Sequence, residues 1–338
     1  EREREREREM GGEMVSAFGS VGRAQGSFNT PRGVAVDGHG RIIVTDTQNH
    51  RVQVFSSDGQ LERVFGGYGS EEGQMLKPTF ATRDRSGRLL VADTQNHRVQ
   101  VFSSEGAFEF SFGSQGTGAG EMQYPYSLAC NQRNQIIVSD TNNHRIQVFS
   151  SEGRFEFTFG TPGIEQGQLR YPFGIACNEL DQIVVADRYN HRVQVFHHNG
   201  DYALSLQGDF SNPHSVAVDP GTQRIIVSDT DRCRLQAFTY DGRFLSAFGS
   251  KGTGLGSFRW PTSVAVDQRG RVLAADLNHR VQVIPAGLWL PFEWSPVRHG
   301  LSPGSIRRVV LTITLIRSFE YWSVLSLIPN ELLFEIFQ

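Results

Sequence analysis

A unit of about 46 residues recurs along most of this chain, and this repetition constrains the possible fold more than any other feature. The string Asn-His-Arg-Val-Gln-Val-Phe, or a close variant of it, occurs six times, at 49–55, 96–102, 143–149, 190–196, 232–238 and 278–284. An aspartate precedes each copy, and these aspartates are 47, 47, 47, 42 and 47 residues apart. The chain of 338 residues therefore contains six similar units.

Each unit has the pattern of four short strands. In the first unit these strands are predicted at 33–37, 41–46, 51–55 and 60–65. The first is built of small residues and the second is continuously apolar, whereas the last two alternate between apolar and polar residues. Turn residues separate the strands, and no stretch of the repeat has helical periodicity. Four strands repeated radially in this way are typical of a β-propeller, so the predicted fold class is an all-β, six-bladed propeller.

The two ends of the repeat region predict how the ring closes. The sixth unit stops after three strands at Ile284, so its outer strand is missing. The segment Met-Val-Ser-Ala-Phe-Gly-Ser at 14–20 matches the outer strand Phe-Leu-Ser-Ala-Phe-Gly-Ser at 244–250. We therefore expect residues 13–19 to complete the last blade and cover its open sheet edge.

The remaining segments do not follow the repeat. The predicted organisation is a low-complexity Glu/Arg segment at 1–12, the propeller at 13–284 and a C-terminal tail at 285–338. The tail contains an apolar run at 309–328, but Arg317 and Glu320 interrupt it. Charges near the middle of a membrane helix are costly, so a tail foreign to the propeller is favoured over a membrane anchor. Its structure and role stay open.

Composition limits the classes of function. The net charge of −3 excludes a chain that binds nucleic acid through an overall excess of positive charge. Three scattered cysteines form neither a disulfide framework nor a zinc motif, which favours the reducing cytoplasm. We expect no cofactor and no metal.

An aspartate and an arginine recur at nearly constant spacing in every unit. A carboxylate and a guanidinium that recur in every blade are typical of a structural clamp, within or between blades, with charge-assisted hydrogen bonds. The histidine beside each arginine is interpreted as a packing residue, because copies in separate blades lie too far apart to share a metal ion. The predicted clamp residues are Asp46, Arg51, Asp93, Arg98, Asp140, Arg145, Asp187, Arg192, Asp229, Arg234, Asp276 and Arg280.

Function is expected where the repeats differ on a shared face. The loop from each outer strand to the next inner strand shares one face, called the top face, with the loop between the second and third strands. Cationic and aromatic side chains interleave there, which suits bases stacked on rings with phosphates nearby. The alternative is that these aromatic residues only seal one blade against the next. The candidate binding residues are Arg32, Lys77, Tyr124, Tyr126, Arg170, Tyr171, Phe173, Arg188, Tyr189, His214, Arg232, Arg259 and Trp260.

The repeated motifs resemble a known family. Asp-x-x-Asn-His-Arg-Val-Gln-Val-Phe, together with Phe-Gly-x-x-Gly-x-x-x-Gly-x-Phe-x-x-Pro-x-Gly-Val-Ala-Val-Asp, resembles the NHL repeat, and most closely the Brat/Wech-like group of tripartite-motif NHL proteins. This resemblance covers residues 14–284. It implies a propeller whose electropositive top face binds single-stranded or stem-loop elements of mRNAs in the cytoplasm and represses them post-transcriptionally.

Two other functions compete with RNA binding. Several NHL propellers bind proteins, so a protein-interaction platform using the same face is the main alternative. An enzyme is not expected, because the predicted innermost strands offer no metal-binding or catalytic side chain except an acid or amide at their last position. The three cysteines cannot build the RING and B-box zinc sites of the full tripartite-motif architecture, so ubiquitin-ligase activity is not expected from this chain.

Overall fold

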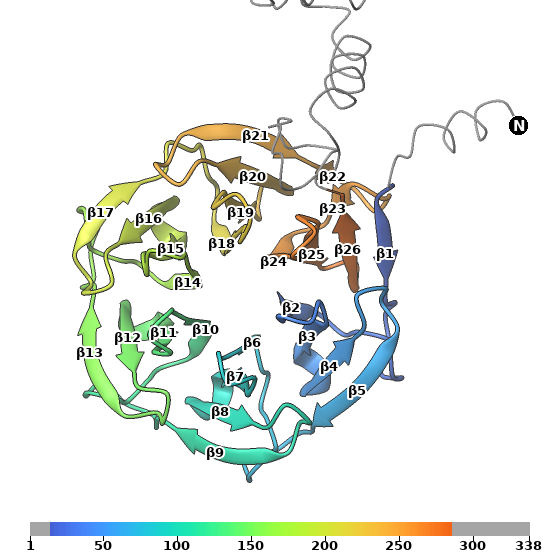
Figure 1. Ribbon diagram of the computed structural model, residues 1–338, viewed down its shortest axis with the longest axis horizontal. Helices are drawn as coiled ribbons and strands as arrows, with labels where there is room; N and C mark the ends of the chain where they lie inside the picture. The colour runs from blue at the N-terminus through green and yellow to red at the C-terminus, as the bar shows by residue number, and fades with distance from the viewer. Residues whose placement is uncertain (1–13, 286–338) are drawn as a thin grey trace, which may run out of the picture. The chain divides into compact units, whose positions relative to one another are not determined.

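The computed structural model describes residues 14–285, and these form six four-stranded antiparallel sheets arranged as blades around a central axis (Figure 1). The predicted all-β, six-bladed propeller is therefore confirmed. The predicted segments at 1–12 and within 286–338 lie outside the described residues, as does the question of a membrane helix in the tail.

The first three blades contain strands β2 to β13 in sequence order, from the axis outward. Blade one is β2 (Pro31–Val36), β3 (Ile42–Asp46), β4 (Arg51–Phe55) and β5 (Leu61–Gly66). Blade two is β6 (Phe80–Arg83), β7 (Leu89–Asp93), β8 (Arg98–Phe102) and β9 (Phe108–Phe112). Blade three is β10 (Pro125–Cys130), β11 (Ile136–Asp140), β12 (Arg145–Phe149) and β13 (Phe155–Phe159).

The last three blades repeat this order. Blade four is β14 (Pro172–Cys177), β15 (Ile183–Asp187), β16 (Arg192–Phe196) and β17 (Tyr202–Ser205). Blade five is β18 (Pro213–Val218), β19 (Ile225–Asp229), β20 (Arg234–Phe238) and β21 (Phe244–Phe248). Blade six contains β24 (Pro261–Val266), β25 (Val272–Asp276) and β26 (Arg280–Ile284), and a short parallel pair, β22 (Ser250–Lys251) and β23 (Ser257–Phe258), precedes it.

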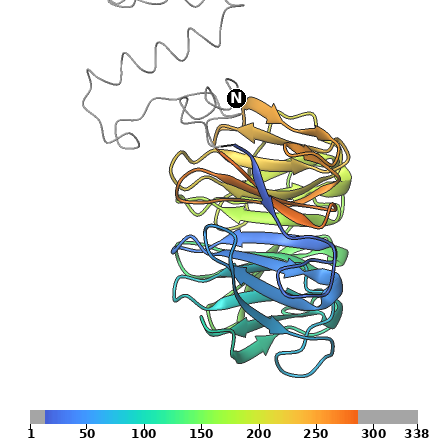
Figure 2. The same cartoon turned by 90° about the vertical axis from the view of Figure 1, so that its right-hand side faces the viewer.

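The N-terminal strand closes the ring as predicted. β1 (Ser16–Phe18) pairs antiparallel with β26, so that Ser16 lies opposite Val283 and Phe18 opposite Val281. Figure 2 shows this blue strand lying across the orange strands of the last blade. This pairing joins the two ends of the propeller and gives blade six its fourth, outer strand.

Aromatic pairs hold neighbouring blades together. The phenylalanine that ends an outer strand packs on the phenylalanine that ends the third strand of the next blade, as in Phe65–Phe102 and Phe112–Phe149, with ring centroids 4.9 Å apart in each pair. Phe18 makes the same contact with Phe55 across the closing seam, also at 4.9 Å. The outer strands therefore stabilise the ring through the next blade as well as through their own.

We expect deletion of the N-terminal residues 1–18 to destabilise the whole ring. The truncation removes the β1–β26 pairing and the Phe18–Phe55 contact, and it exposes the edge of β26. An exposed edge strand promotes aggregation, so a lower thermal midpoint and oligomers on gel filtration are predicted. Deletion of residues 1–13 alone is the control. An equal effect of both deletions would contradict the role of β1 in closing the ring.

The inner strands begin earlier than the sequence suggested. β2 starts at Pro31 rather than at residue 33, and a register shift separates Pro31 from Gly33. The other inner strands that begin at a proline carry an equivalent shift. In β18 and β24 it lies at the same place as in β2, and in β10 and β14 it extends one residue further. The residue that follows each of these prolines is therefore part of an inner strand.

Candidate functional site

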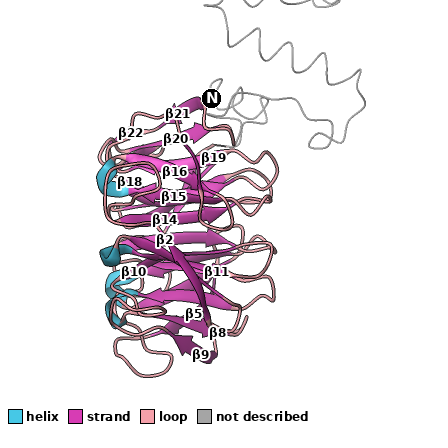
Figure 3. Ribbon diagram, turned by 90° about the vertical axis from the view of Figure 1, so that its left-hand side faces the viewer, coloured by secondary structure: helices cyan, strands magenta, loops and turns pink. Residues whose placement is uncertain are grey.

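The top face is defined by two sets of loops that lie on the same side of the ring. One set is the loops that lead into the inner strands, at 19–30, 66–77, 113–124, 160–171, 207–212 and 249–260. The other joins the second and third strands and includes four 3-10 helices, η1 (Thr47–Asn49), η2 (Thr94–Asn96), η3 (Thr141–Asn143) and η4 (Arg188–Asn190). Figure 3 shows these helices, in cyan, gathered on one face.

The recurrent aspartate and arginine form the base of this face. In blade three, the fully buried Asp140 accepts hydrogen bonds from Arg145 Nε at 2.7 Å, Asn143 Nδ2 at 2.9 Å, Gln147 Nε2 at 3.0 Å and the Gln123 backbone N–H at 2.6 Å. The same ion pair at 2.7–2.9 Å occurs in four other blades: Asp46–Arg51, Asp93–Arg98, Asp187–Arg192 and Asp229–Arg234. The carboxylate therefore connects the loop that precedes the inner strand with the second and third strands of the same blade.

The clamp of the sixth blade is weaker. Asp276 and Arg280 are only four residues apart, and their closest atoms, Oδ2 and Nη2, are 3.6 Å apart. Arg280 Nε is buried without a hydrogen-bond partner among the described residues. Burial raises the pKa of Asp276, in keeping with a carboxylate that its arginine compensates less well.

The recurrent histidines connect each blade to the next. Nδ1 of His50, His97, His144, His191 and His279 accepts a hydrogen bond from a backbone N–H in the next top-face loop, at 3.0–3.2 Å. The bond from Thr30 N–H to His279 Nδ1 closes this series around the ring. Because Nδ1 must be unprotonated to accept the bond, protonation of this nitrogen would break an interblade contact.

We predict that this arrangement makes stability sensitive to mild acid. Burial is the main cause that lowers the pKa of His50, His97 and His144 below the ordinary 6.5. The unfolded chain therefore takes up protons at a higher pH than the folded chain does. The free energy of unfolding should be highest above pH 6.5 and should fall as the pH drops below it.

Thermal melts from about pH 8 to about pH 5 measure this effect. Replacement of all three histidines by asparagine keeps an acceptor, suits their left-handed backbone and removes the titration. The variant should lose much less stability over that range than the parent chain. An identical decline in both proteins would contradict the role of these histidines.

The candidate binding residues occupy four structural positions. Arg170 and Arg259 lie two residues before a proline, and their side chains are exposed. Lys77, Tyr124, Tyr171 and Trp260 lie directly before a proline and have positive φ angles of 50–53°. Arg188, Tyr189 and Arg232 lie in the loops between the second and third strands. Arg32, Tyr126, Phe173 and His214 directly follow a proline and so belong to inner strands.

Two of the inner-strand residues require a correction. Tyr126 and His214 were expected to bind RNA on the top face, but they are only 6% and 5% exposed. The reason is that the strands begin at the prolines, so the residue after the proline lies at the mouth of the central channel. The inner strands thus carry a histidine that the sequence interpretation had not placed there.

The two buried side chains form one cluster with Phe173. The Tyr126 and Phe173 rings stack with centroids 4.1 Å apart, and the Tyr126 hydroxyl lies 3.0 Å from His214 Nε2. His214 Nδ1 lies 2.6 Å from the Thr262 carbonyl oxygen, so Nδ1 carries the proton and Nε2 accepts from the tyrosine. Burial, helped by the charges of Arg188 and Arg32, lowers the pKa of His214 well below 6.5.

Five cations on the top face lack a carboxylate partner. No ion pair or side-chain hydrogen bond with another described residue is made by Arg32, Lys77, Arg170, Arg188 or Arg259. Two of them lie over aromatic rings, Arg188 at 4.4 Å from the centre of Phe173 and Arg259 at 5.5 Å from that of Trp260. Arg232 differs, because it pairs with Asp209 at 2.5 Å.

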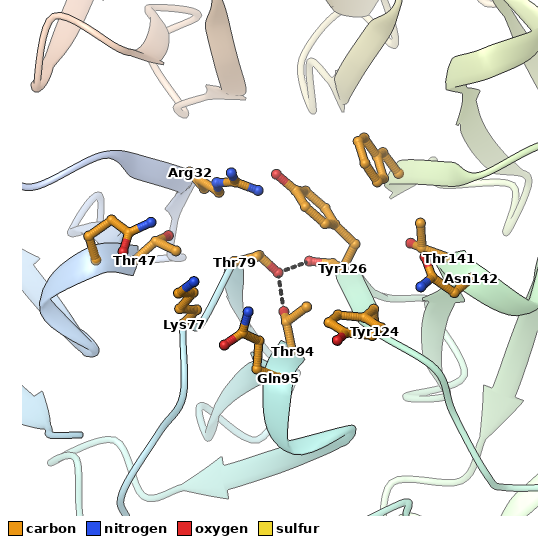
Figure 4. Close-up of a pocket in the computed structure, with 12 residues that line it drawn as sticks. Arg32, Thr47, Lys77, Thr79, Thr94, Gln95, Tyr124, Tyr126, Thr141 and Asn142 are labelled. Atoms are coloured by element: carbon orange, nitrogen blue, oxygen red, sulfur yellow. Dashed lines mark hydrogen bonds between the residues drawn. The ribbon is translucent and has the colours of Figure 1, made fainter. Parts of the chain in front are cut away.

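A pocket opens among the first three blades and Phe173 of the fourth on this face, with a volume of about 250 Å³. Figure 4 shows its side chains converging on a common space. Its threonines are bonded to the protein, as where Thr79 Oγ1 donates to the Tyr126 carbonyl oxygen at 2.6 Å. The lining residues are Arg32, Thr47, Gln48, Lys77, Thr79, Thr94, Gln95, Tyr124, Tyr126, Thr141, Asn142 and Phe173.

Sequence reasoning missed three carboxamides in this pocket. Gln48, Gln95 and Asn142 occupy the same position in successive blades. Their side-chain amides make no hydrogen bond with other described residues. Their shared offset after the recurrent aspartate was the signal that could have found them. Free amides beside free cations and aromatic rings can recognise the polar edge, the face and the charge of a planar anionic ligand.

Two negative observations apply to residues 14–285. They contain no group of three or more His, Cys, Asp or Glu side chains placed to hold a metal ion. They also contain no helix long and apolar enough to cross a membrane.

Curated relatives match only a short stretch of the chain. The B-box type zinc finger protein ncl-1 of Caenorhabditis elegans is 54% identical over 43 residues, which is 13% of this chain and 5% of that protein. Protein brain tumor of Drosophila melanogaster is 49% identical over 43 residues, 13% of this chain and 4% of its own length. Tripartite motif-containing protein 3 of mouse is 46% identical over 48 residues, 14% and 6% of the two chains.

Solved structures match the fold over a longer range. A streptogramin B lyase superimposes with a TM-score of 0.58 at 12% identity, covering 80% of this chain and 96% of the lyase. A gluconolactonase from Xanthomonas campestris gives a TM-score of 0.59 at 14% identity, covering 78% and 87% of the two chains. At such low identity these matches show the fold alone.

Family models agree with the repeat. The NHL repeat model matches residues 28–55, 169–196 and 210–238, and a 6-bladed beta-propeller model matches 81–156. These segments lie in blades one to five and contain the recurrent aspartate and arginine. The chain is a six-bladed β-propeller that contains NHL repeats.

Proposed function

We propose that this propeller binds RNA through its top face, recognises single-stranded or stem-loop elements of mRNAs, and represses these mRNAs post-transcriptionally in the cytoplasm. The short matches to ncl-1 and brain tumor support a propeller that serves as an RNA or protein interaction platform. The choice of RNA rests on the chemistry of the top face.

The observation that carries this proposal is the set of five unpaired cations, Arg32, Lys77, Arg170, Arg188 and Arg259. Arginines elsewhere are commonly neutralised, as in Arg41–Asp37 at 2.8 Å and Arg271–Asp267 at 2.7 Å on the opposite face. Cations without carboxylate partners favour a polyanionic ligand. The half-exposed rings of Tyr124, Tyr189 and Trp260 offer surfaces on which bases can stack.

A salt titration tests the proposal. Binding of fluorescent single-stranded and stem-loop RNAs should weaken steeply with salt, because each phosphate contact releases counterions. For four or five contacts to single-stranded RNA, the slope of log K against log salt should be about −3. Binding that is absent, or that is independent of salt, would contradict the proposal.

A protein-interaction platform is the second candidate, and a specific observation favours it. Four large apolar side chains are exposed on the outer parts of the top-face loops: Val21 (70%), Tyr68 (74%), Ile164 (68%) and Leu255 (59%). Exposed apolar groups at a rim fit a protein partner better than a phosphate backbone. Crosslinking in cell extracts discriminates the two, since this candidate predicts proteins and no RNA bound to these loops.

A further inference from the structure

The mouth of the central channel is partly covered by three side chains from consecutive blades. Tyr126, Phe173 and His214 form this roof, through ring stacking at 4.1 Å and the bond between the Tyr126 hydroxyl and His214 Nε2 at 3.0 Å. The bond from His214 Nδ1 to the Thr262 carbonyl oxygen, at 2.6 Å, fixes the histidine from the next blade. The roof is therefore a rigid surface.

Two arginines lie against this roof. The Arg188 guanidinium covers the Phe173 ring at 4.4 Å, and its Nε is buried without a hydrogen-bond partner among the described residues. Arg32 lines the adjoining pocket, and Figure 4 shows its guanidinium directed toward the Tyr126 hydroxyl. Both guanidiniums thus face the same corner of the channel mouth with their N–H donors free.

The local charges do not cancel. Burial is the main cause that lowers the pKa of Arg188, and the positive charge of Arg32 lowers it further. Asp231 acts in the opposite direction, but its carboxylate is hydrogen-bonded to Asn212 and makes no ion pair with Arg188. With Lys77 in the same pocket, three cationic side chains against one carboxylate leave two positive charges uncompensated.

We propose that Arg32 and Arg188 form a binding site for a phosphate monoester at the channel mouth, and that its ligand is the 5′-terminal phosphate of an RNA. Planar guanidiniums bind phosphate oxygens in pairs, and a phosphate monoester carries close to two negative charges at neutral pH. The two uncompensated positive charges match a phosphate monoester at a chain end better than an internal phosphodiester, which carries a single negative charge. The RNA source of the phosphate rests on the proposed function, whereas the anion site does not.

Inorganic phosphate tests the anion site without RNA. Added to the full chain at about ten times its dissociation constant, it should raise the thermal midpoint by about 3 °C relative to chloride at equal ionic strength. Arg32→Gln and Arg188→Gln should each abolish most of this shift. The side chains of both arginines make no hydrogen bond within the described chain, so these variants are expected to fold. Arg154→Gln on the opposite face is the matched control. Absence of the shift in the parent chain would overturn the proposal.

Paired oligonucleotides test the source of the phosphate. An RNA with a 5′-phosphate should bind about tenfold more tightly than the same RNA with a 5′-hydroxyl, and Arg188→Gln should reduce this ratio to about one. Equal affinities, with the inorganic phosphate shift intact, would overturn the RNA-end assignment in favour of a free phosphate or a phosphopeptide. If neither RNA binds while the shift persists, the proposed function fails and the anion site stands.

Discussion

Replacement of Asp140 by asparagine should lower the free energy of unfolding by about 3–5 kcal/mol. The carboxylate is fully buried and accepts from Arg145, Asn143 and Gln147 through one oxygen. An asparagine has only one acceptor, so its NH₂ group would face either these three donors or the Gln123 N–H. Arg145 would also lose the charge that compensates it.

Chemical denaturation with Asp276→Asn as the matched control measures this loss. In blade six the arginine approaches Asp276 only to 3.6 Å, so the same substitution should cost about 1–2 kcal/mol. The difference between the two losses of unfolding free energy gives the contribution of the close ion pair, apart from the cost of changing a buried aspartate. Equal losses would show that the recurrent ion pair does not contribute to stability in the way described.

Charge reversal on the top face should have the largest effect on binding. Arg188→Glu and Arg170→Glu should each weaken RNA binding by about 10- to 100-fold, because each removes a cation and adds a charge that repels phosphate. Arg170 is exposed and Arg188 is partly covered, and neither side chain has a hydrogen-bonded partner in the described chain. Folding should therefore be retained.

Arg154→Glu is the control for this prediction, since Arg154 is exposed in a turn between the third and fourth strands of blade three, on the opposite face. It changes the net charge by the same amount. Titration of one RNA against the three variants at fixed salt should show a loss for the two top-face variants alone. Equal effects of all three would mean that net charge, and not the top face, governs binding.

The repeat in the sequence was sufficient to predict the fold. A carboxylate and an arginine at nearly constant intervals predicted six blades, and the match between residues 14–20 and 244–250 predicted the strand that closes the ring. These features depend on periodicity alone, which a sequence displays directly. The exact start of each inner strand did not follow from it.

Side-chain direction at the channel mouth could not be predicted in the same way. Tyr126 and His214 are buried because they pack on each other and on Phe173. The contacts among Tyr126, Phe173 and His214 join three blades, and the sequence separates these residues by 47 and 41 positions. Which cations lack partners also depends on the folded arrangement, as the pairing of Arg232 with Asp209 illustrates.

Mapping of ultraviolet crosslinks between the propeller and a bound RNA tests the central claim most directly. The account predicts crosslinked peptides from the top face, in particular residues 120–126 and 170–173 and the η4 segment with Arg188 and Tyr189. The turns of the opposite face, such as 150–154 and 197–201, should remain free of crosslinks. Crosslinks confined to these turns, or spread evenly over both faces, would contradict an RNA-binding top face.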